Sequence, residues 1–313
     1  MTARAPNTES SHDDFSDRHG INDHRPRLLG LAYRMLGDVD EAEDVVQEAF
    51  LRWQLTDQHT VRSPEAWLMT VVTRLSVDRL RRLKTERSTY PGPWLPEPIA
   101  TDPALAPSTP PAPDHAAELA SDLSVALLVL LERLAPEERA AFLLREVFDS
   151  EYEEIAQILE RSSDAVRQMV HRARTRVRSE RTRVVAPPGE HERLLERFVD
   201  ALTADDAPAL LALLAPDVAL ASDGGGQARA ARRWLLGPDR VARFLLGVSR
   251  KFGQGFSRRL AQLNGRPAML VFSEGVLVSA TTVDVEDGRI RALHIIRNPD
   301  KLRHALDTSV RIV

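Results

Sequence analysis

The sequence predicts a multidomain protein in which two all-α units precede one α+β unit. Apolar residues recur at helical spacing over residues 22–87 and again over residues 117–185. Nine of the 20 prolines lie between them, in residues 88–114, where fixed φ angles and missing amide donors favour an extended linker. After Pro187-Pro188-Gly189 the helical spacing gives way to strand-like alternation. The expected units are a disordered tail (1–20), a helical unit (21–88), the linker (89–116), a second helical unit (117–186) and an α+β unit (190–313).

The composition limits the classes of protein to consider. Hydrophobic residues make up 43% of the chain, which is enough for folded cores, and the absence of cysteine excludes disulfides and thiolate metal sites. We expect no membrane span, because no stretch approaches roughly 18 apolar residues, and the polar N-terminus has no signal core. The net charge of -4 argues weakly against nucleic-acid binding, but such binding depends on local patches of charge.

The first helical unit begins with a helix over residues 28–36 that Gly37 should end. A second helix is expected from about Asp38, because acidic residues crowd its early turns and suit the positive end of the helix dipole. Asp44, Gln47 and Glu48 share one face of this helix at i, i+3 and i+4. From the residues alone, this face is either a solvated acidic surface or a binding surface.

A third helix opens at Ser63-Pro64, with serine as N-cap and proline at the first helical position. Opposite its apolar side it carries long cationic side chains, which suit a phosphate backbone. These are Arg74, Arg79, Arg81, Arg82 and Lys84. The alternative is a solubilising face with Asp78 as a local partner.

The second helical unit contains a helix-turn-helix pattern. Ser150 and Glu153 fit a capping box, a short helix follows, and Ser162 can cap a longer helix with one apolar stripe. The formal charge over residues 163–183 is +5, against -4 for the whole chain. An ordinary helical hairpin with a basic surface is the alternative.

The start of the longer helix is expected to meet base edges, because arginine can donate two bonds to guanine and glutamine can pair with adenine. The residues concerned are Ser163, Arg167, Gln168 and His171. Arg172 and Arg174, further along the helix, are expected to contact phosphates.

The third unit is expected to hold helices followed by strands. The helices are predicted over residues 190–202, 207–214 and 238–250, and the strands over 256–296, with a two-residue hairpin at Asp287-Gly288. A glycine run, residues 224–226, is expected in a loop, where it permits either close backbone approach or simple flexibility.

Residues 40–53, DEAEDVVQEAFLRW, resemble region 2 of extracytoplasmic-function (ECF) RNA polymerase sigma factors, and residues 134–178 resemble their region 4. The resemblance implies that the Asp44–Glu48 face docks on the β′ clamp helices of core polymerase, with the β flap as a further partner. It also implies that the promoter −10 strand binds region 2 with one base flipped out. The expected −10 residues are Arg62, Arg74, Asp78, Arg79 and Arg82. The helix-turn-helix residues Ser163, Arg167, Gln168, His171, Arg172 and Arg174 become the −35 reader.

One position departs from the region 4 pattern. Glu160 stands where the family often has glycine. A left-handed conformation at this residue would cost roughly 1–2 kcal/mol.

The third unit resembles the SnoaL-like, NTF2-like cone that is fused to sigma factors of the sigma J type. Three motifs carry this resemblance: Trp94-Leu95-Pro96-Glu97-Pro98, Asp223-Gly224-Gly225-Gly226 and Asn298-Pro299-Asp300-Lys301-Leu302. Gln227 stands where the subfamily usually has lysine. Because Trp94 and Leu95 are apolar in a polar linker, we expect them to dock on the third unit or on polymerase. The resemblance implies a cytoplasmic, non-enzymatic initiation factor whose third domain modulates its activity, with a pocket for a small-molecule ligand.

Two other functions are compatible with the residues. One is a ligand-sensing helix-turn-helix regulator that acts without polymerase. The other is a SnoaL-like isomerase or cyclase with Asp223, Asp284 and His294 as acid–base candidates. Charge reversal at Glu48 separates a sigma factor from the regulator, since only a sigma factor needs that face for polymerase binding.

Overall fold

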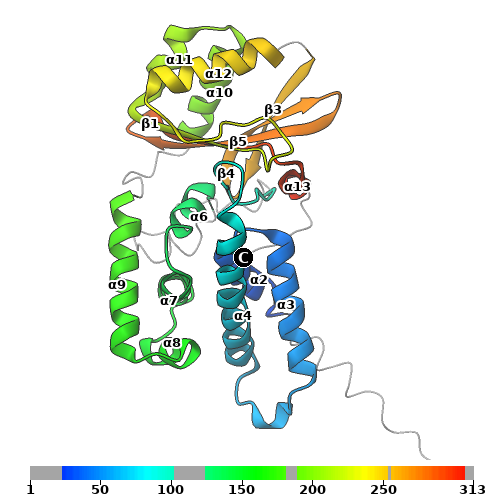
Figure 1. The fold of residues 1–313 in the computed structure, drawn as a ribbon, viewed down its shortest axis with the longest axis vertical. Helices are drawn as coiled ribbons and strands as arrows, with labels where there is room; N and C mark the ends of the chain where they lie inside the picture. Colours follow the sequence, from blue (N-terminus) through cyan, green and yellow to red (C-terminus); the bar gives the residue numbers. More distant parts are fainter. Residues whose placement is uncertain (1–22, 102–123, 181–188, 253–254, 307–313) are drawn as a thin grey trace, which may run out of the picture.

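The computed structural model describes residues 23–101, 124–180, 189–252 and 255–306. The expected N-terminal tail, the linker residues 102–116 and the boundary prolines lie outside these ranges. The described part consists of a helical half and a half built on one curved sheet (Figure 1). None of the described helices combines the length and the apolar character of a membrane span.

The first helical unit forms where the capping signals predict it. Gly37 ends the first helix with φ 69°, and Asp38 begins the next by accepting a hydrogen bond from the Glu41 amide. Ser63 caps the long helix by accepting from the Ala66 amide at 3.2 Å. The elements are α2 (Arg25–Leu36), α3 (Val39–Gln54), the 3-10 turn η1 (Gln58–Thr60) and α4 (Pro64–Arg87).

The second helical unit contains the expected helix-turn-helix. Its elements are α6 (Val125–Leu131), α7 (Pro136–Glu146), α8 (Tyr152–Leu159) and α9 (Ser163–Glu180). The capping box of α8 is one residue later than predicted, because Glu151 and Glu154 form it. Asp149 is left-handed (φ 52°) and the Ser150 amide donates to Leu144, so Ser150 still belongs to the turn that closes α7.

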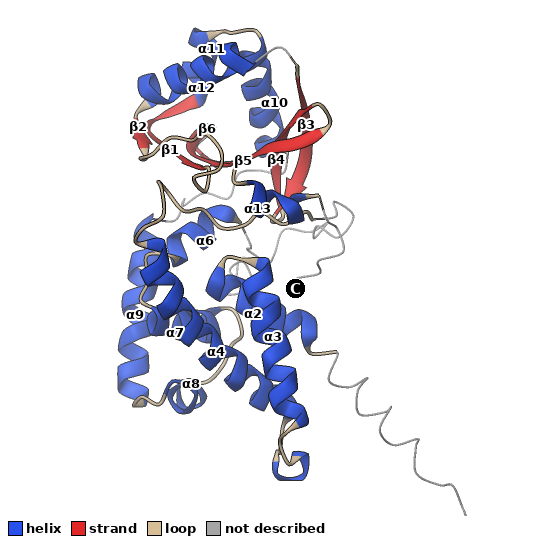
Figure 2. Cartoon of the chain, turned by 45° about the vertical axis from the view of Figure 1, so that its right-hand side comes forward, coloured by secondary structure: helices blue, strands red, loops and turns tan. Residues whose placement is uncertain are grey.

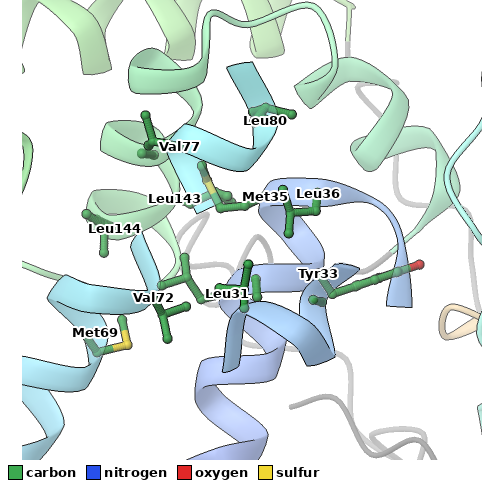
Figure 3. Close-up of a cluster of buried hydrophobic side chains, with 14 of the residues drawn as sticks. Leu31, Tyr33, Met35, Leu36, Met69, Val72, Val77, Leu80, Leu143 and Leu144 are labelled. Atoms are coloured by element: carbon green, nitrogen blue, oxygen red, sulfur yellow. The ribbon is translucent and has the colours of Figure 1, made fainter. Parts of the chain in front are cut away.

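The two helical units share a single hydrophobic core, although a linker separates them in sequence (Figure 3). Leu143 and Leu144 of α7 are completely buried. They belong to the same cluster as Met35 of α2 and Val72 and Val77 of α4. The sequence predicted two separate units without any sign of this packing, because Val77 of α4 and Leu143 of α7 are 66 positions apart.

The third unit is a six-stranded sheet in the order β2-β1-β6-β5-β4-β3, with β1 parallel to β6 and the other neighbours antiparallel. Its strands are β1 (Leu214–Asp223), β2 (Leu235–Leu236), β3 (Phe256–Leu263), β4 (Arg266–Ser273), β5 (Val276–Glu286) and β6 (Arg289–Ile296). Its helices are α10 (Glu190–Thr203), α11 (Ala207–Leu213), α12 (Pro238–Phe252), α13 (Pro299–Leu302) and the 3-10 turn η3 (Arg303–Ala305).

Two features of the sheet bear on the predictions. The hairpin at Asp287-Gly288 is confirmed, with both residues left-handed at φ 50° and 71°, as a type I′ turn requires. The strand β1 was not predicted. Asp223, which directly precedes the glycine run expected in a loop, therefore ends a strand and is fully buried.

The two faces of the sheet have different neighbours (Figure 2). Helices α10, α11 and α12 cover one face, and Ile295 points into that core. The opposite face packs against Leu95 of the linker, against α6 and against α13, and Ile296 points into this second cluster. The second face thus joins the third unit to the helical half.

Candidate functional site

The acidic face of α3 is open to solvent. Asp44, Gln47 and Glu48 are all exposed, whereas Val45 and Val46 on the same helix are buried. The Glu48 carboxylate forms a 2.8 Å ion pair with Arg52, one turn along the helix. The face is therefore available to a partner that carries positive charge.

Arg74, an expected −10 residue, contacts the helix-turn-helix unit in this structure. Its Nε donates to the Ile158 carbonyl at 2.9 Å and its Nη2 to the Gln157 carbonyl at 3.0 Å. These carbonyls belong to the last turn of α8, where unpaired acceptors and the negative end of the helix dipole favour a cation. An ion pair with Glu160 at 3.1 Å adds to the contact.

The other expected −10 residues of α4 do not form one free basic face. The Arg79 guanidinium forms a bidentate pair with Glu41, and this hydrogen bonding raises the pKa of Arg79. Asp78 pairs with Arg81 at 2.7 Å. The remaining expected −10 residues, Arg82 of α4 and Arg62 in the loop before it, are exposed.

The expected −35 residues lie on the outer side of α9. Gln168 and His171 are exposed near its start, after the half-buried Ser163. Arg167 is also exposed and pairs with Glu153 at 2.9 Å and with Asp164 at 3.0 Å.

The two arginines expected to contact phosphates are paired with glutamates of α7. Arg172 donates to Glu138 at 2.9 Å, and Arg174 donates to Glu146 at 2.5 Å. The turn before α9 has Glu160 in the left-handed conformation (φ 54°, ψ 49°), so the departure from glycine carries the expected strain.

A partly buried ion-pair network joins the two helical units, and no sequence pattern signalled it. Glu132 pairs with Arg139 of its own unit and, at 2.7 Å, with Arg87 at the end of α4. Burial acts to raise the pKa of Glu132, but the charges of Arg139 and Arg87 outweigh it and hold that pKa below its usual value. Arg87 also donates to the Leu36 carbonyl at 2.9 Å.

The three motifs that carry the resemblance to the sigma J type meet at Asp223. We use the name junction for Asp223 together with the linker and α13 residues that contact it. The Asp223 carboxylate accepts from the Tyr90 hydroxyl at 2.6 Å, the Leu95 amide at 2.9 Å and the Gly225 amide at 3.0 Å. Its fourth partner is the Lys301 ammonium at 2.7 Å. A buried carboxylate with four donors is fully satisfied.

Lys301 is the cation of the junction. Its Nζ also donates to the Leu95 carbonyl at 2.5 Å and lies 4.0 Å from the centre of the Trp94 ring. Burial lowers the pKa of Lys301, and the charge of Asp223 opposes this effect. Arg87 stacks on the same Trp94 ring, with its guanidinium carbon at 3.4 Å. Trp94 therefore docks on both the third unit and the first helical unit.

Glu97 ties the linker to the first helical unit. Its carboxylate accepts from the Val39 amide at 2.8 Å and contacts Nδ1 of His304 at 2.7 Å, and its carbonyl accepts from the Tyr33 hydroxyl at 2.6 Å. Burial raises the pKa of Glu97, while the contacts with His304 and Val39 lower it. Asn264 of the third unit donates to the same Tyr33 hydroxyl at 2.7 Å.

The glycine run gives close backbone approach. Gly225 has φ 60°, and a Cβ atom there would lie 2.4 Å from the Asn298 amide nitrogen. Gln227 donates to Asp300 at 2.6 Å. Position 227 therefore contributes a neutral amide to this contact, and the cation of the junction is Lys301.

Two of the acid–base candidates of the catalytic alternative lie close together, with 3.8 Å between Asp284 Oδ2 and His294 Nδ1. The third unit contains a cavity of about 290 Å³, and none of Asp223, Asp284 and His294 is among its lining residues. His294 lies edge-on to Trp234, and burial lowers its pKa to about 4, so the ring is neutral at pH 7. None of the three is therefore placed to act on a ligand in this cavity.

Comparison with known proteins agrees with this geometry. The Sigma-70 region 2 model matches residues 21–86, and the Sigma-70 region 4 model matches residues 124–177. The chain is 40% identical over 287 residues to the ECF RNA polymerase sigma factor SigJ of Mycobacterium tuberculosis, covering 88% of this chain and 90% of that protein. The chain belongs to the ECF RNA polymerase sigma factors.

A second relative and a solved structure also match over most of the chain. A probable ECF sigma factor, SigI of M. tuberculosis, is 32% identical and covers 89% of this chain and 92% of its own length. The crystal structure of M. tuberculosis SigJ matches with a TM-score of 0.72 at 34% identity and covers 93% of this chain and 99% of that one. The predicted fold, two helical sigma regions followed by an α+β domain, is confirmed. As a sigma factor, the protein directs RNA polymerase to promoters.

Proposed function

We propose that this sigma factor binds core polymerase through Asp44, Gln47 and Glu48 and reads the −35 element with the exposed face of α9. It reads the −10 element with α4 and the loop before it. The third domain holds the two readers together until polymerase and promoter DNA separate them. The observation that carries the proposal is the docking of Arg74 of α4 on the last turn of α8.

The docked arrangement is incompatible with simultaneous reading of both elements. The −10 and −35 elements are about 25 base pairs apart, or roughly 85 Å at about 3.4 Å per base pair. In the structure, regions 2 and 4 share one core, and Arg74 reaches region 4 directly. The two regions must therefore come apart before the protein can span a promoter, and Arg74 becomes available to DNA only then.

The third domain restrains this separation through the linker. Tyr90, Leu95 and Glu97 anchor the linker to both the third domain and region 2. The 12 residues from 90 to 101 would reach roughly 40 Å if extended, at about 3.3–3.6 Å per residue. While the junction is intact, this length does not contribute to the reach between regions 2 and 4. This binding takes place in the cytoplasm. The partners are promoter DNA and core polymerase, which is contacted at its β′ clamp helices and β flap.

Polymerase binding is tested by charge reversal on α3. The Glu48→Lys variant is combined with core polymerase and assayed for binding and for run-off transcription. Glu86→Lys is the matched control, since Glu86 is also an exposed acid of region 2 but lies on α4. We expect Glu48→Lys alone to lose binding and transcription. Equal binding by both variants would contradict the assignment of this face.

The restraint by the third domain is tested by opening the junction. Asp223→Asn removes the charge that holds Lys301, whereas Asp217→Asn changes an exposed aspartate on the same strand. At limiting core polymerase, we expect more run-off transcript from Asp223→Asn than from the wild type, and no change for Asp217→Asn. Reduced or unchanged output from a folded Asp223→Asn protein would count against the restraint.

A further inference from the structure

The third domain contains a cavity of about 290 Å³, partly open to solvent, between the sheet and helices α10 and α12. This volume is near the lower end of the roughly 300–1,000 Å³ typical of small-molecule sites. Phe198 and Leu202 of α10, Phe244 of α12 and Met269 of β4 contribute apolar walls. The site therefore suits a compact ligand with an apolar body.

The charged residues that line the cavity all carry the same sign. They are Arg229, Lys251, Arg258 and Arg297, and the described lining contains neither an acidic residue nor a histidine. Arg297 is half-buried, and burial lowers its pKa. Because all of the charged lining residues are cationic, their combined field favours an anionic ligand over a cationic one.

A buried hydroxyl also faces this cavity. Ser222 is 2% exposed, and its Oγ has no hydrogen-bond partner among the described residues. In the sheet, Ser222 pairs with Ile295, so both point to the same face, and Arg297 follows two residues after Ile295. Arg297 also donates to the Arg229 carbonyl at 2.6 Å. The Ser222 hydroxyl and the Arg297 side chain thus lie at the ends of β1 and β6, where a carboxylate can accept a hydrogen bond from Ser222 and a charge-assisted one from Arg297.

We propose that this cavity binds a small carboxylic acid with an apolar body. Its carboxylate lies at Ser222 and Arg297, and its apolar part lies between the sheet and α10 and α12. The residue after Ser222 is Asp223, whose carboxylate holds the junction on the opposite face. A bound acid would therefore contact the same strands that carry the junction. Binding itself does not depend on the proposed function and is measured without polymerase.

The test uses calorimetric titration of the full-length protein with sodium decanoate. 1-Decanol, which has the same apolar body without the charge, is the matched ligand. We expect saturable binding of decanoate and an affinity for decanol that is weaker by about tenfold or more, as loss of a charge-assisted hydrogen bond implies. Equal affinity for the two, or no decanoate binding, would overturn the proposal.

Variants locate the site. Arg297→Gln and Arg258→Gln should each weaken decanoate binding, and Ser222→Ala should weaken it less. Arg259→Gln is the matched control, because Arg259 lies next to Arg258 on β3 but is exposed, stacks on Phe272 and does not line the cavity. Thermal unfolding confirms that each variant is folded. Unchanged decanoate affinity in both folded Arg297→Gln and folded Arg258→Gln would also overturn the proposal.

Discussion

Removing the charge of Asp223 should open the junction far more than removing the charge of Lys301. Asp223→Asn leaves the Lys301 ammonium buried beside an amide, with the Leu95 carbonyl as its main remaining acceptor. Removal of one partner from a buried ion pair costs about 3–5 kcal/mol. Lys301→Met is milder, because Asp223 keeps three donors, from Tyr90, Leu95 and Gly225. We expect it to cost about 1–3 kcal/mol, the range for an incompletely satisfied buried group.

The double variant Asp223→Asn/Lys301→Met distinguishes this argument from general damage. Without the ammonium, the neutral side chain at position 223 no longer faces an unpaired charge, so the double variant should be less destabilised than the sum of the two single variants. Neighbouring residues in one network commonly show coupling of about 0.5–3 kcal/mol.

Hydrogen exchange of the Leu95 amide measures the effect directly, because this amide donates to Asp223. Exchange of the peptide covering residues 94–99 is followed by mass spectrometry in the full chain. A local opening that is easier by about 3 kcal/mol speeds exchange by roughly a hundredfold. Asp217→Asn is the control. The reasoning fails if Lys301→Met accelerates exchange as much as Asp223→Asn, or if the two effects add in the double variant.

Three further predictions concern stability. Leu143→Ala should lower the free energy of unfolding of the helical half by about 2–5 kcal/mol in urea titrations, because the side chain is completely buried between the two regions; a loss below that range would mean that regions 2 and 4 do not share a core. Glu160→Gly should raise the melting temperature by relieving about 1 kcal/mol of left-handed strain, since the exposed ion pair with Arg74 contributes little; a lower melting temperature would refute this. His294 has a folded-state pKa of about 4, below the ordinary 6.5, so the unfolded chain binds more protons and stability falls as pH falls from 6.5 to 4. His294→Gln should show a shallower loss over that range in thermal unfolding, and an identical pH profile would contradict the assignment.

The local structure of the helical half was predictable because its signals are local. Asp38 and Ser63 act as caps, and the apolar stripe of α9 is buried, as their sequence patterns indicated. The capping box was placed one residue too early because the pairs Ser150/Glu153 and Glu151/Glu154 both have the spacing of a capping box. Only the left-handed Asp149 selects between them. The strand β1 was missed because it is buried at both ends and begins directly after α11, without a turn residue to mark it.

The sequence by itself determined the two sigma regions, the turn chemistry and the identity of the motif residues, since each depends on contacts within a few positions. Only the tertiary structure decided what these residues contact. Arg74, predicted on a DNA-binding face, lies on α8, and Asp223 binds a tyrosine 133 positions before it and a lysine 78 positions after it. Such pairs leave no periodicity in the chain, because burial and charge compensation between distant segments arise only when the segments pack together.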